Sequence, residues 1–152
     1  MTIEEKMQVE VIKGNKYYYC DFEGYTLITD GHFGVYIPSK EMKLNKDSMN
    51  EIKNSDSLNP DNILKESYSA IDTRVAYKLL FAKPEFAIKI KSTENDKVCF
   101  INEKYLKLFK NFDHLYIKDE KSVVLVTRYG LPYGIILPIN ISKKQLEELE
   151  KC

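Results

Sequence analysis

The sequence predicts a single α+β domain of 152 residues, built mainly from antiparallel strands with two or three short helices. A hydrophobic share of 43% is enough to form the core of one ordinary globular domain. Aromatic and β-branched residues gather in short runs broken by glycine, which is typical of strands joined by tight turns. Links of a few residues favour antiparallel pairing, because parallel strands need a long crossover.

The first third of the chain predicts a meander of short strands. Gly14, Gly24 and Gly31 lie at the breaks between apolar runs, where a chain reversal is easiest for glycine. The predicted strands are Val9 to Ile12, Lys16 to Phe22, Tyr25 to Thr29 and Phe33 to Ile37.

A polar insertion is expected from about residue 39 to about residue 70, where Asn, Ser and Asp dominate. Within it, Asn59-Pro60 can start a short helix over Asp61 to Lys65, since proline is favoured in the first helical turn. A longer helix is predicted from Asp72 to Phe81, with Asp72 as its N-cap and Pro84 beyond its end. The apolar residues Val75, Ala76, Leu79 and Leu80 would share one face of it.

Another helix should begin after Asn102, a favourable N-cap residue. Its apolar face would consist of Tyr105, Leu106, Phe109 and Phe112. Lys104, Lys107 and Lys110 recur at every third position, so they would cluster on another face of the helix.

The second half predicts five more strands and a terminal helix. The strands are Phe86 to Lys91, Lys97 to Ile101, His114 to Lys118, Ser122 to Tyr129 and Tyr133 to Ile139. Gly130 and Pro132 mark the turn between the last two strands. Ser142 and Gln145 have capping-box spacing, which predicts a helix over about 142–152 that presents Leu146 and Leu149.

Composition indicates a soluble cytoplasmic protein. The 23 basic and 23 acidic residues cancel, so nucleic acid could be bound only through a local patch. The first residues are acidic where a signal peptide is basic, and no apolar run reaches the roughly 18 residues that a membrane helix needs. Cys20, Cys99 and Cys152 are far apart and odd in number, as expected of reduced thiols.

The motifs of catalysis are missing from the sequence, so we expect no enzyme, no cofactor and no metal. His32 and His114 lack a recognisable nucleophile beside them, and no phosphate loop or zinc spacing occurs. Asp30 could pair with Asp21 or Glu23 for acid–base work, but acidic residues beside glycine more often stabilise turns.

Basic residues of two predicted helices suggest contact with DNA. Lys104, Lys107 and Lys110, together with Arg74 and Lys78 of the 72–81 helix, could hold phosphates without reading bases. The competing interpretation is an ordinary solvated helix face.

Several short motifs resemble a domain of the bacterial DNA sliding clamp. The segment Ile28-Thr29-Asp30-Gly31-His32 is similar to the Thr-Asp-Gly-His signature of clamp domains. In the second half, the order of matching motifs is that of the closing half of a clamp domain. These motifs are Phe100 with Asn102, Tyr105-Leu106, Ser122-Val123-Val124 and Leu137-Pro138-Ile139.

The resemblance implies helices on one face of curved sheets, turned toward DNA. It also implies a pocket for short peptides of a polymerase or other replication protein; the candidate residues are Thr29, Gly31, His32, Leu137, Pro138 and Ile139. In clamps the two halves of this pocket come from adjacent domains, so a complete pocket would require association between copies. Phe33 and Gly34 stand where the family usually has Arg and Leu.

The preferred hypothesis is a non-catalytic, clamp-like replication accessory protein that is encoded by a phage, forms a homo-oligomer and binds DNA without sequence preference. Since a clamp ring contains six domains, a ring would need about six copies of this chain. The alternative is a small interaction protein that binds and modulates another protein without DNA. A small enzyme using Asp30 and His32 is the third hypothesis.

Overall fold

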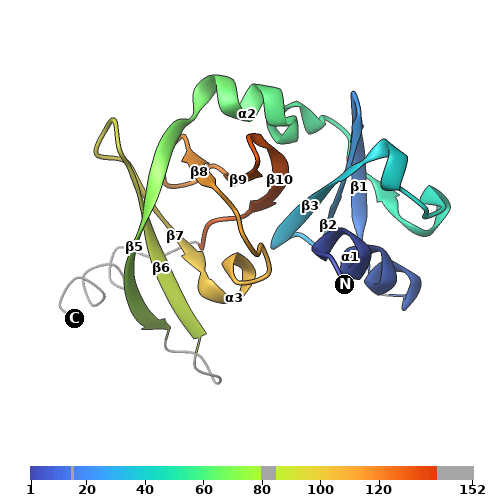
Figure 1. Ribbon diagram of the computed structural model, residues 1–152, viewed down its shortest axis with the longest axis horizontal. Helices are drawn as coiled ribbons and strands as arrows, with labels where there is room; N and C mark the ends of the chain where they lie inside the picture. Colours follow the sequence, from blue (N-terminus) through green and yellow to red (C-terminus); the bar gives the residue numbers. More distant parts are fainter. Residues whose placement is uncertain (15, 80–84, 140–152) are drawn as a thin grey trace.

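One ten-stranded sheet runs through the protein and carries helices on both faces (Figure 1). The computed structural model describes residues 1–14, 16–79 and 85–139, and the side chains of residues 74–79 and 85 lie outside the described part. All strand pairs are antiparallel except that of β1 with β4. The predicted α+β class, mainly antiparallel with short helices, is confirmed.

Each of the three helices of the described chain is followed by a run of three strands. The helices are α1 (Ile3–Ile12), α2 (Pro60–Glu66) and α3 (Glu103–Leu106). The strands are β1 (Tyr18–Phe22), β2 (Tyr25–Thr29), β3 (Phe33–Pro38), β4 (Asn50–Glu51), β5 (Tyr68–Leu79), β6 (Glu85–Ser92), β7 (Val98–Asn102), β8 (His114–Ile117), β9 (Val124–Arg128) and β10 (Leu131–Ile136). The strand order is β4-β1-β2-β3-β10-β9-β8-β5-β6-β7.

The connectivity contains an internal repeat. A helix followed by a three-stranded antiparallel meander occurs three times, as α1-β1-β2-β3, α2-β5-β6-β7 and α3-β8-β9-β10. The first and third meanders meet where β3 pairs antiparallel with β10, with Gly134 opposite Val35 and Ile135 opposite Gly34. The order β1-β2-β3-β10-β9-β8 therefore has approximate two-fold symmetry about this β3–β10 seam.

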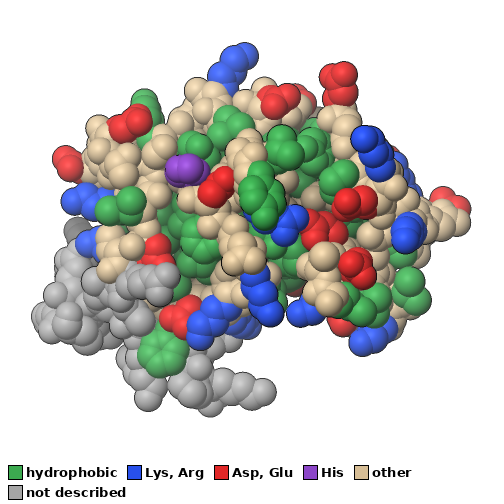
Figure 2. All heavy atoms as spheres, in the orientation of Figure 1, with side chains coloured by type: hydrophobic (Ala, Val, Ile, Leu, Met, Phe, Trp, Pro, Cys, Tyr) green, Lys and Arg blue, Asp and Glu red, His purple; other side chains and the backbone are tan. Residues whose placement is uncertain are grey.

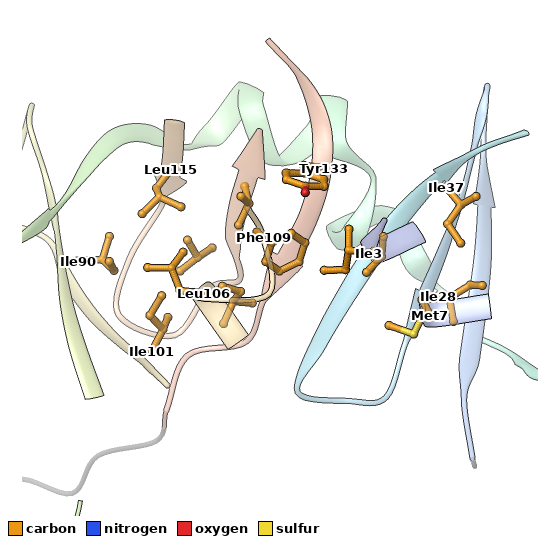
Figure 3. Close-up of a cluster of buried hydrophobic side chains, with 14 of the residues drawn as sticks. Ile3, Met7, Ile28, Ile37, Ile90, Ile101, Leu106, Phe109, Leu115 and Tyr133 are labelled. Carbon is orange, nitrogen blue, oxygen red and sulfur yellow. The ribbon is translucent and has the colours of Figure 1, made fainter. Parts of the chain in front are cut away.

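Helices α1 and α3 lie on the same face of the sheet, here called the helix face. Met7 of α1 and Leu106 of α3 belong to one buried cluster, which also contains Phe109 (Figure 3). Ile63 of α2 belongs to a separate cluster on the opposite face. Because neighbouring strand residues point to opposite faces, β3 serves both clusters, with Val35 in the first and Tyr36 in the second.

Gly134 at the seam makes room for an aromatic ring. A Cβ on Gly134 would collide with the ring of Phe109 and would lie 2.5 Å from the carbonyl oxygen of Gly34. Phe109 is 1% exposed and packs edge-on against Tyr133, with 5.1 Å between ring centroids. The absent side chain thus lets the turn after α3 lie against the seam (Figure 3).

The predicted strand from Val9 to Ile12 is wrong, because this segment belongs to α1. Thr2 is the N-cap, and its hydroxyl oxygen accepts a hydrogen bond from the Glu5 backbone N–H at 3.2 Å. Ile3, Met7 and Val11 recur every fourth residue and are all buried. That helical stripe outweighs the strand preference of the β-branched residues at the end of the segment.

The predicted helix from Asp72 to Phe81 is also wrong, because Tyr68–Leu79 forms the long strand β5. This strand pairs with β6 along most of its length and with β8 at its start. The pairing with β6 shifts between Asp72 and Ala76, and the Thr73 hydroxyl donates to the Lys89 carbonyl oxygen at 2.9 Å. Hairpin pairing with β6, together with the pairing of its first residues with β8, therefore overrides an apolar pattern that also fits a helix.

The other elements predicted within the described residues are present, most of them with somewhat different bounds. The strands at 16–22, 25–29 and 33–37 appear as β1, β2 and β3, and the short helix after Asn59-Pro60 appears as α2. The insertion holds three single turns of 3₁₀ helix, β4, α2 and the start of β5; the turns are Ser39–Glu41, Lys46–Ser48 and Ser55–Leu58.

The five strands predicted in the second half appear as β6 to β10, although β10 ends at Ile136 rather than Ile139. The terminal helix predicted over about 142–152 lies outside the described residues. Within the described part, none of the helices has the length and apolar character required to cross a bilayer.

Candidate functional site

The predicted lysine row lies on α3 and the turn that follows it. Asn102 begins the helix as expected, because its side-chain oxygen accepts a hydrogen bond from the Lys104 backbone N–H at 3.0 Å. The helix ends at Leu106, so it supplies one turn rather than the longer helix that the apolar pattern predicted. Lys104, Lys107 and Lys110 are all exposed.

Neighbouring groups engage two of these lysines. The Lys107 ammonium lies 2.6 Å from a carboxylate oxygen of Glu103, and the Lys104 ammonium lies 5.1 Å from the centroid of the Tyr105 ring. Lys110 makes no ion pair within the described residues. The row is therefore a weaker source of positive potential than three isolated ammonium groups would be.

Arg74 and Lys78, the other predicted DNA contacts, lie on β5 rather than on a helix. Their side chains are outside the described part of the structure. The helix that accompanies α3 on the helix face is α1, in which Val9 to Ile12 were wrongly predicted as a strand.

The exposed charges of α1 are mixed. Lys6 is exposed and makes no ion pair among the described residues, whereas Lys13 lies 3.5 Å from Glu10. Glu5 is exposed in the first turn. Figure 2 shows this mixture along the lower edge of the molecule, where basic side chains in blue alternate with acidic ones in red.

Helix α1 is held firmly against the sheet. The nearly buried Glu4 carboxylate accepts a hydrogen bond from the Arg128 guanidinium at 3.1 Å, and that guanidinium lies 4.1 Å from the centroid of the Tyr133 ring. On the other side, the Gln8 amide donates to the Glu41 carbonyl and accepts from the Lys43 backbone N–H. The position of α1 is thus fixed by contacts far away in the sequence.

The Thr29-Asp30-Gly31-His32 segment forms the turn between β2 and β3. The Thr29 hydroxyl oxygen accepts from the Gly31 backbone N–H at 3.0 Å and donates to the Phe33 carbonyl at 2.7 Å. The Asp30 carboxylate accepts from the backbone N–H groups of His32 and Phe33. Gly31 has a φ of 94°, which favours glycine.

The acidic residues proposed as a pair have separate partners. Asp30 stabilises its own turn, whereas Asp21 lies 2.8 Å from Lys46 and accepts a hydrogen bond from Thr26. Burial raises the pKa of Asp21, but the hydrogen bonds from Lys46 and Thr26 outweigh it and hold this pKa below its usual value. The arrangement is that of structural carboxylates.

The two clamp-like motifs meet within one chain. The Leu137 backbone N–H donates to the His32 carbonyl at 2.9 Å, which places the segment after β10 against the turn after β2. The Ile139 backbone N–H donates to the Phe100 carbonyl at 2.7 Å, so Pro138 lies between two fixed contacts. Two segments that the resemblance assigns to adjacent domains thus lie side by side in one chain, and the expectation that a complete pocket requires association between copies stays a prediction.

Aromatic stacking connects this junction to α3. The His32 and Tyr105 rings are nearly parallel with centroids 5.9 Å apart, and the Phe33 ring also stacks with Tyr105, with centroids 5.2 Å apart. His32 is exposed and Leu137 is half-buried, so a partner could reach both residues. We call His32, Tyr105 and Leu137 the motif junction.

The described residues include no group of three or more His, Cys, Asp or Glu side chains arranged to hold a metal ion. Cys20 and Cys99 are buried free thiols, and burial raises their pKa values to about 11 and about 12. These thiols are neutral at physiological pH and are poorly suited to act as nucleophiles.

Comparison with protein-family models, curated proteins and solved structures finds no match for this chain.

Proposed function

We propose that this chain is a clamp-like, DNA-associated replication accessory protein that acts in the cytoplasm without catalysis. Its helix face would hold duplex DNA through phosphates alone, and the protein would therefore bind without sequence preference. The single observation that carries the proposal is that α1 and α3 lie on one face of a continuous sheet, with lysines exposed on both. This placement is the one that the sliding-clamp resemblance implies.

The charges of the helix face support weak binding. Lys6, Lys104, Lys107 and Lys110 are exposed, but Glu103 already engages one of them. If about three phosphates are contacted, the logarithm of the binding constant should fall with the logarithm of salt concentration with a slope of about −3. Non-specific affinities are typically about 10⁻⁴ to 10⁻⁶ M at physiological salt, and we expect the weak end of that range.

The test is a salt titration of binding to a fluorescent DNA duplex of arbitrary sequence, read by anisotropy. The double variant Lys104→Glu with Lys107→Glu should bind at least about tenfold more weakly and reduce the salt slope by about 2. Two duplexes of unrelated sequence should give equal affinities, because phosphate contacts carry no sequence information.

A matched control reverses two charges on the opposite face. Lys65 and Lys121 are exposed and line a hollow beside α2, so Lys65→Glu with Lys121→Glu changes the net charge equally. This control should retain most of the affinity. Equal losses in both double variants, or no binding by the wild type at low salt, would exclude the helix face as a DNA site.

A second candidate function is binding of a partner protein without DNA, and the motif junction favours it. The approach of Leu137 to His32 completes within one chain a pair of segments that the resemblance assigns to peptide capture. Light-scattering mass and the DNA titration separate the candidates. A strict monomer without DNA affinity would favour the second function, whereas DNA affinity lost on reversing the α3 lysines would favour the first.

A further inference from the structure

An apolar groove lies on the helix face between α1 and the turn after α3. It has a volume of about 450 Å³, within the range of about 300 to 1,000 Å³ usual for ligand sites. Its apolar lining includes Ile3, Met7, Val9, Tyr17, Phe33 and Leu108. Val9 and Leu108 are 36% and 39% exposed, so the groove presents apolar surface to solvent.

The walls of the groove are fixed before any partner arrives. The ion pair of Glu4 with Arg128 and the two hydrogen bonds of Gln8 hold α1 in place. On the other wall, Leu108 precedes Phe109, whose ring is locked at the β3–β10 seam. A preformed groove loses little conformational entropy when it is filled.

The α1 side of the groove carries a net positive charge. Lys6 and Lys13 line it with Glu10, which lies 3.5 Å from Lys13, and Lys6 makes no ion pair among the described residues. Lys107 and Lys110 are exposed and lie within two residues of Leu108 in the sequence, but they do not line the groove, and Glu103 pairs with Lys107. An occupant that combines apolar groups with negative charge is therefore complementary to the groove.

We propose that this groove binds a short amphipathic segment of a partner protein, with large apolar side chains along one stripe and carboxylates beside it. Phosphates alone would leave the apolar floor exposed to water, so the floor favours a protein segment over nucleic acid. A second copy of this chain would bring the same positively charged side of the groove against itself, which like-charge repulsion opposes. This inference does not depend on the proposed DNA function.

The occupant would compete with DNA if both bind. Its carboxylates would contact lysines of the same face that the DNA proposal uses, so the two ligands could not occupy the face together. This predicts displacement of labelled duplex by the peptide, but peptide binding itself is measured without DNA. Failure of either proposal therefore leaves the other one open to its own test.

The probe is a fluorescein-labelled designed helix of about 14 residues with Leu and Phe at helical i, i+4 and i+7 spacing and Glu beside them. Two further probes are a scrambled peptide of the same composition and a version with Lys in place of Glu. The acidic amphipathic peptide should bind at least about tenfold more tightly than either, a difference of about 1.4 kcal/mol.

Three variants test whether the peptide binds in the groove, and a fourth serves as a control. Val9→Asp and Leu108→Asp should each weaken binding about tenfold or more, because a buried charge opposes the apolar contact. Ile12→Asp is the matched control, since Ile12 is 73% exposed on the same helix but does not line the groove. Lys6→Glu should weaken binding of the acidic peptide and strengthen binding of the basic peptide. Loss of folding cannot produce such an inversion of preference.

The proposal is overturned if the three peptides bind equally, if Ile12→Asp weakens binding as much as Val9→Asp, or if Lys6→Glu causes no inversion. A concentration-dependent dimer that Val9→Asp disrupts would also overturn it, because a second copy would then be the occupant. Urea unfolding midpoints of all variants identify any loss that reflects stability rather than contact.

Discussion

The substitution Gly134→Ala tests the packing of the β3–β10 seam most directly. Its new Cβ would collide with the Phe109 ring and would lie 2.5 Å from the Gly34 carbonyl oxygen. Neither neighbour can move easily, because the ring is 1% exposed and the oxygen belongs to a central strand. Overpacking of this kind lowers the free energy of unfolding by about 1 to 3 kcal/mol, occasionally more. Replacing glycine also makes the unfolded chain less flexible, which raises the free energy of unfolding by about 0.4 to 1 kcal/mol.

We therefore expect Gly134→Ala to lower the free energy of unfolding by about 2 kcal/mol, or the Tm by roughly 4 to 8 °C for a chain of this size. Urea unfolding followed by circular dichroism measures the change, with an unaltered m-value if only the native state is affected. Gly34→Ala is the matched control. Its Cβ would lie 2.8 Å from a flexible Leu27 methyl group, so a smaller loss of about 1 kcal/mol is expected.

A double-mutant cycle identifies the ring as the cause. Phe109→Leu removes the two ring atoms that a Cβ at position 134 would meet, so part of the clash disappears. The loss caused by Gly134→Ala should then be about 1 to 2 kcal/mol smaller in the Phe109→Leu background than in the wild type. A loss below about 0.5 kcal/mol in the wild type, or strict additivity with Phe109→Leu, would refute this account of the seam.

Three further substitutions test the anchoring of the elements that flank the site. Arg128→Met should lower the free energy of unfolding by about 3 kcal/mol, because it leaves the nearly buried Glu4 carboxylate unpaired. Amide hydrogen exchange should then accelerate first in α1, and unchanged exchange in α1 would contradict this prediction. Tyr36→Phe should lower the free energy of unfolding by about 1 to 2 kcal/mol, because the buried Tyr36 hydroxyl donates a hydrogen bond at 2.6 Å to the Leu58 carbonyl, just before α2. An unchanged urea midpoint would contradict this prediction. Burial raises the pKa of Asp113, but hydrogen bonds such as that from Thr127 outweigh it and hold the pKa below its ordinary value of 3.8. The stability that Asp113 contributes is therefore complete above about pH 4 and is lost as the pH falls through its folded-state pKa. The Tm difference between wild type and Asp113→Asn should accordingly shrink below about pH 4. A difference that stayed constant with pH would refute this role of Asp113.

Local signals were sufficient for the meanders β1-β2-β3 and β8-β9-β10. Gly24 lies between β1 and β2 with a φ of 82°, and Gly130 lies between β9 and β10 with a φ of 73°. Such turns are accessible to glycine and mark strand ends in the sequence itself. Asn59 and Asn102 likewise cap α2 and α3 with their own side chains, so these helix starts could be predicted from single residues.

The two wrong predictions of secondary structure arose where pairing or packing outside the segment decides its structure. The apolar pattern around Val75 and Leu79 fits a helix, but hairpin pairing with β6, the next strand along the chain, makes the segment a strand. At the N-terminus, the four-residue spacing of Ile3, Met7 and Val11 did carry a helical signal, which the β-branched end of the segment obscured. A local window contains neither the partner strand nor the apolar surface on which α1 packs.

The candidate site was predictable in its parts but not in its assembly. The spacing of Lys104, Lys107 and Lys110 located the basic row, whereas the length of α3 and the engagement of Lys107 by Glu103 required coordinates. Both segments of the motif junction could be recognised in the sequence. Their meeting follows from the β3–β10 pairing, which joins strands about a hundred residues apart and leaves no local trace.

The repeat in connectivity is not a repeat in packing, and this difference explains where the apolar groove lies. Helix α1 has 10 residues, about 15 Å of helix, and packs on β3, whereas α3 has 4 residues and packs on β6 and β7. The irregular turn that follows α3 fills the seam with Phe109 but turns Leu108 toward solvent. A second helix as long as α1 could extend over this region. Because the described chain provides only one helical turn there, apolar surface beside α1 stays exposed. The groove is therefore a consequence of the unequal cover that α1 and α3 give to the helix face.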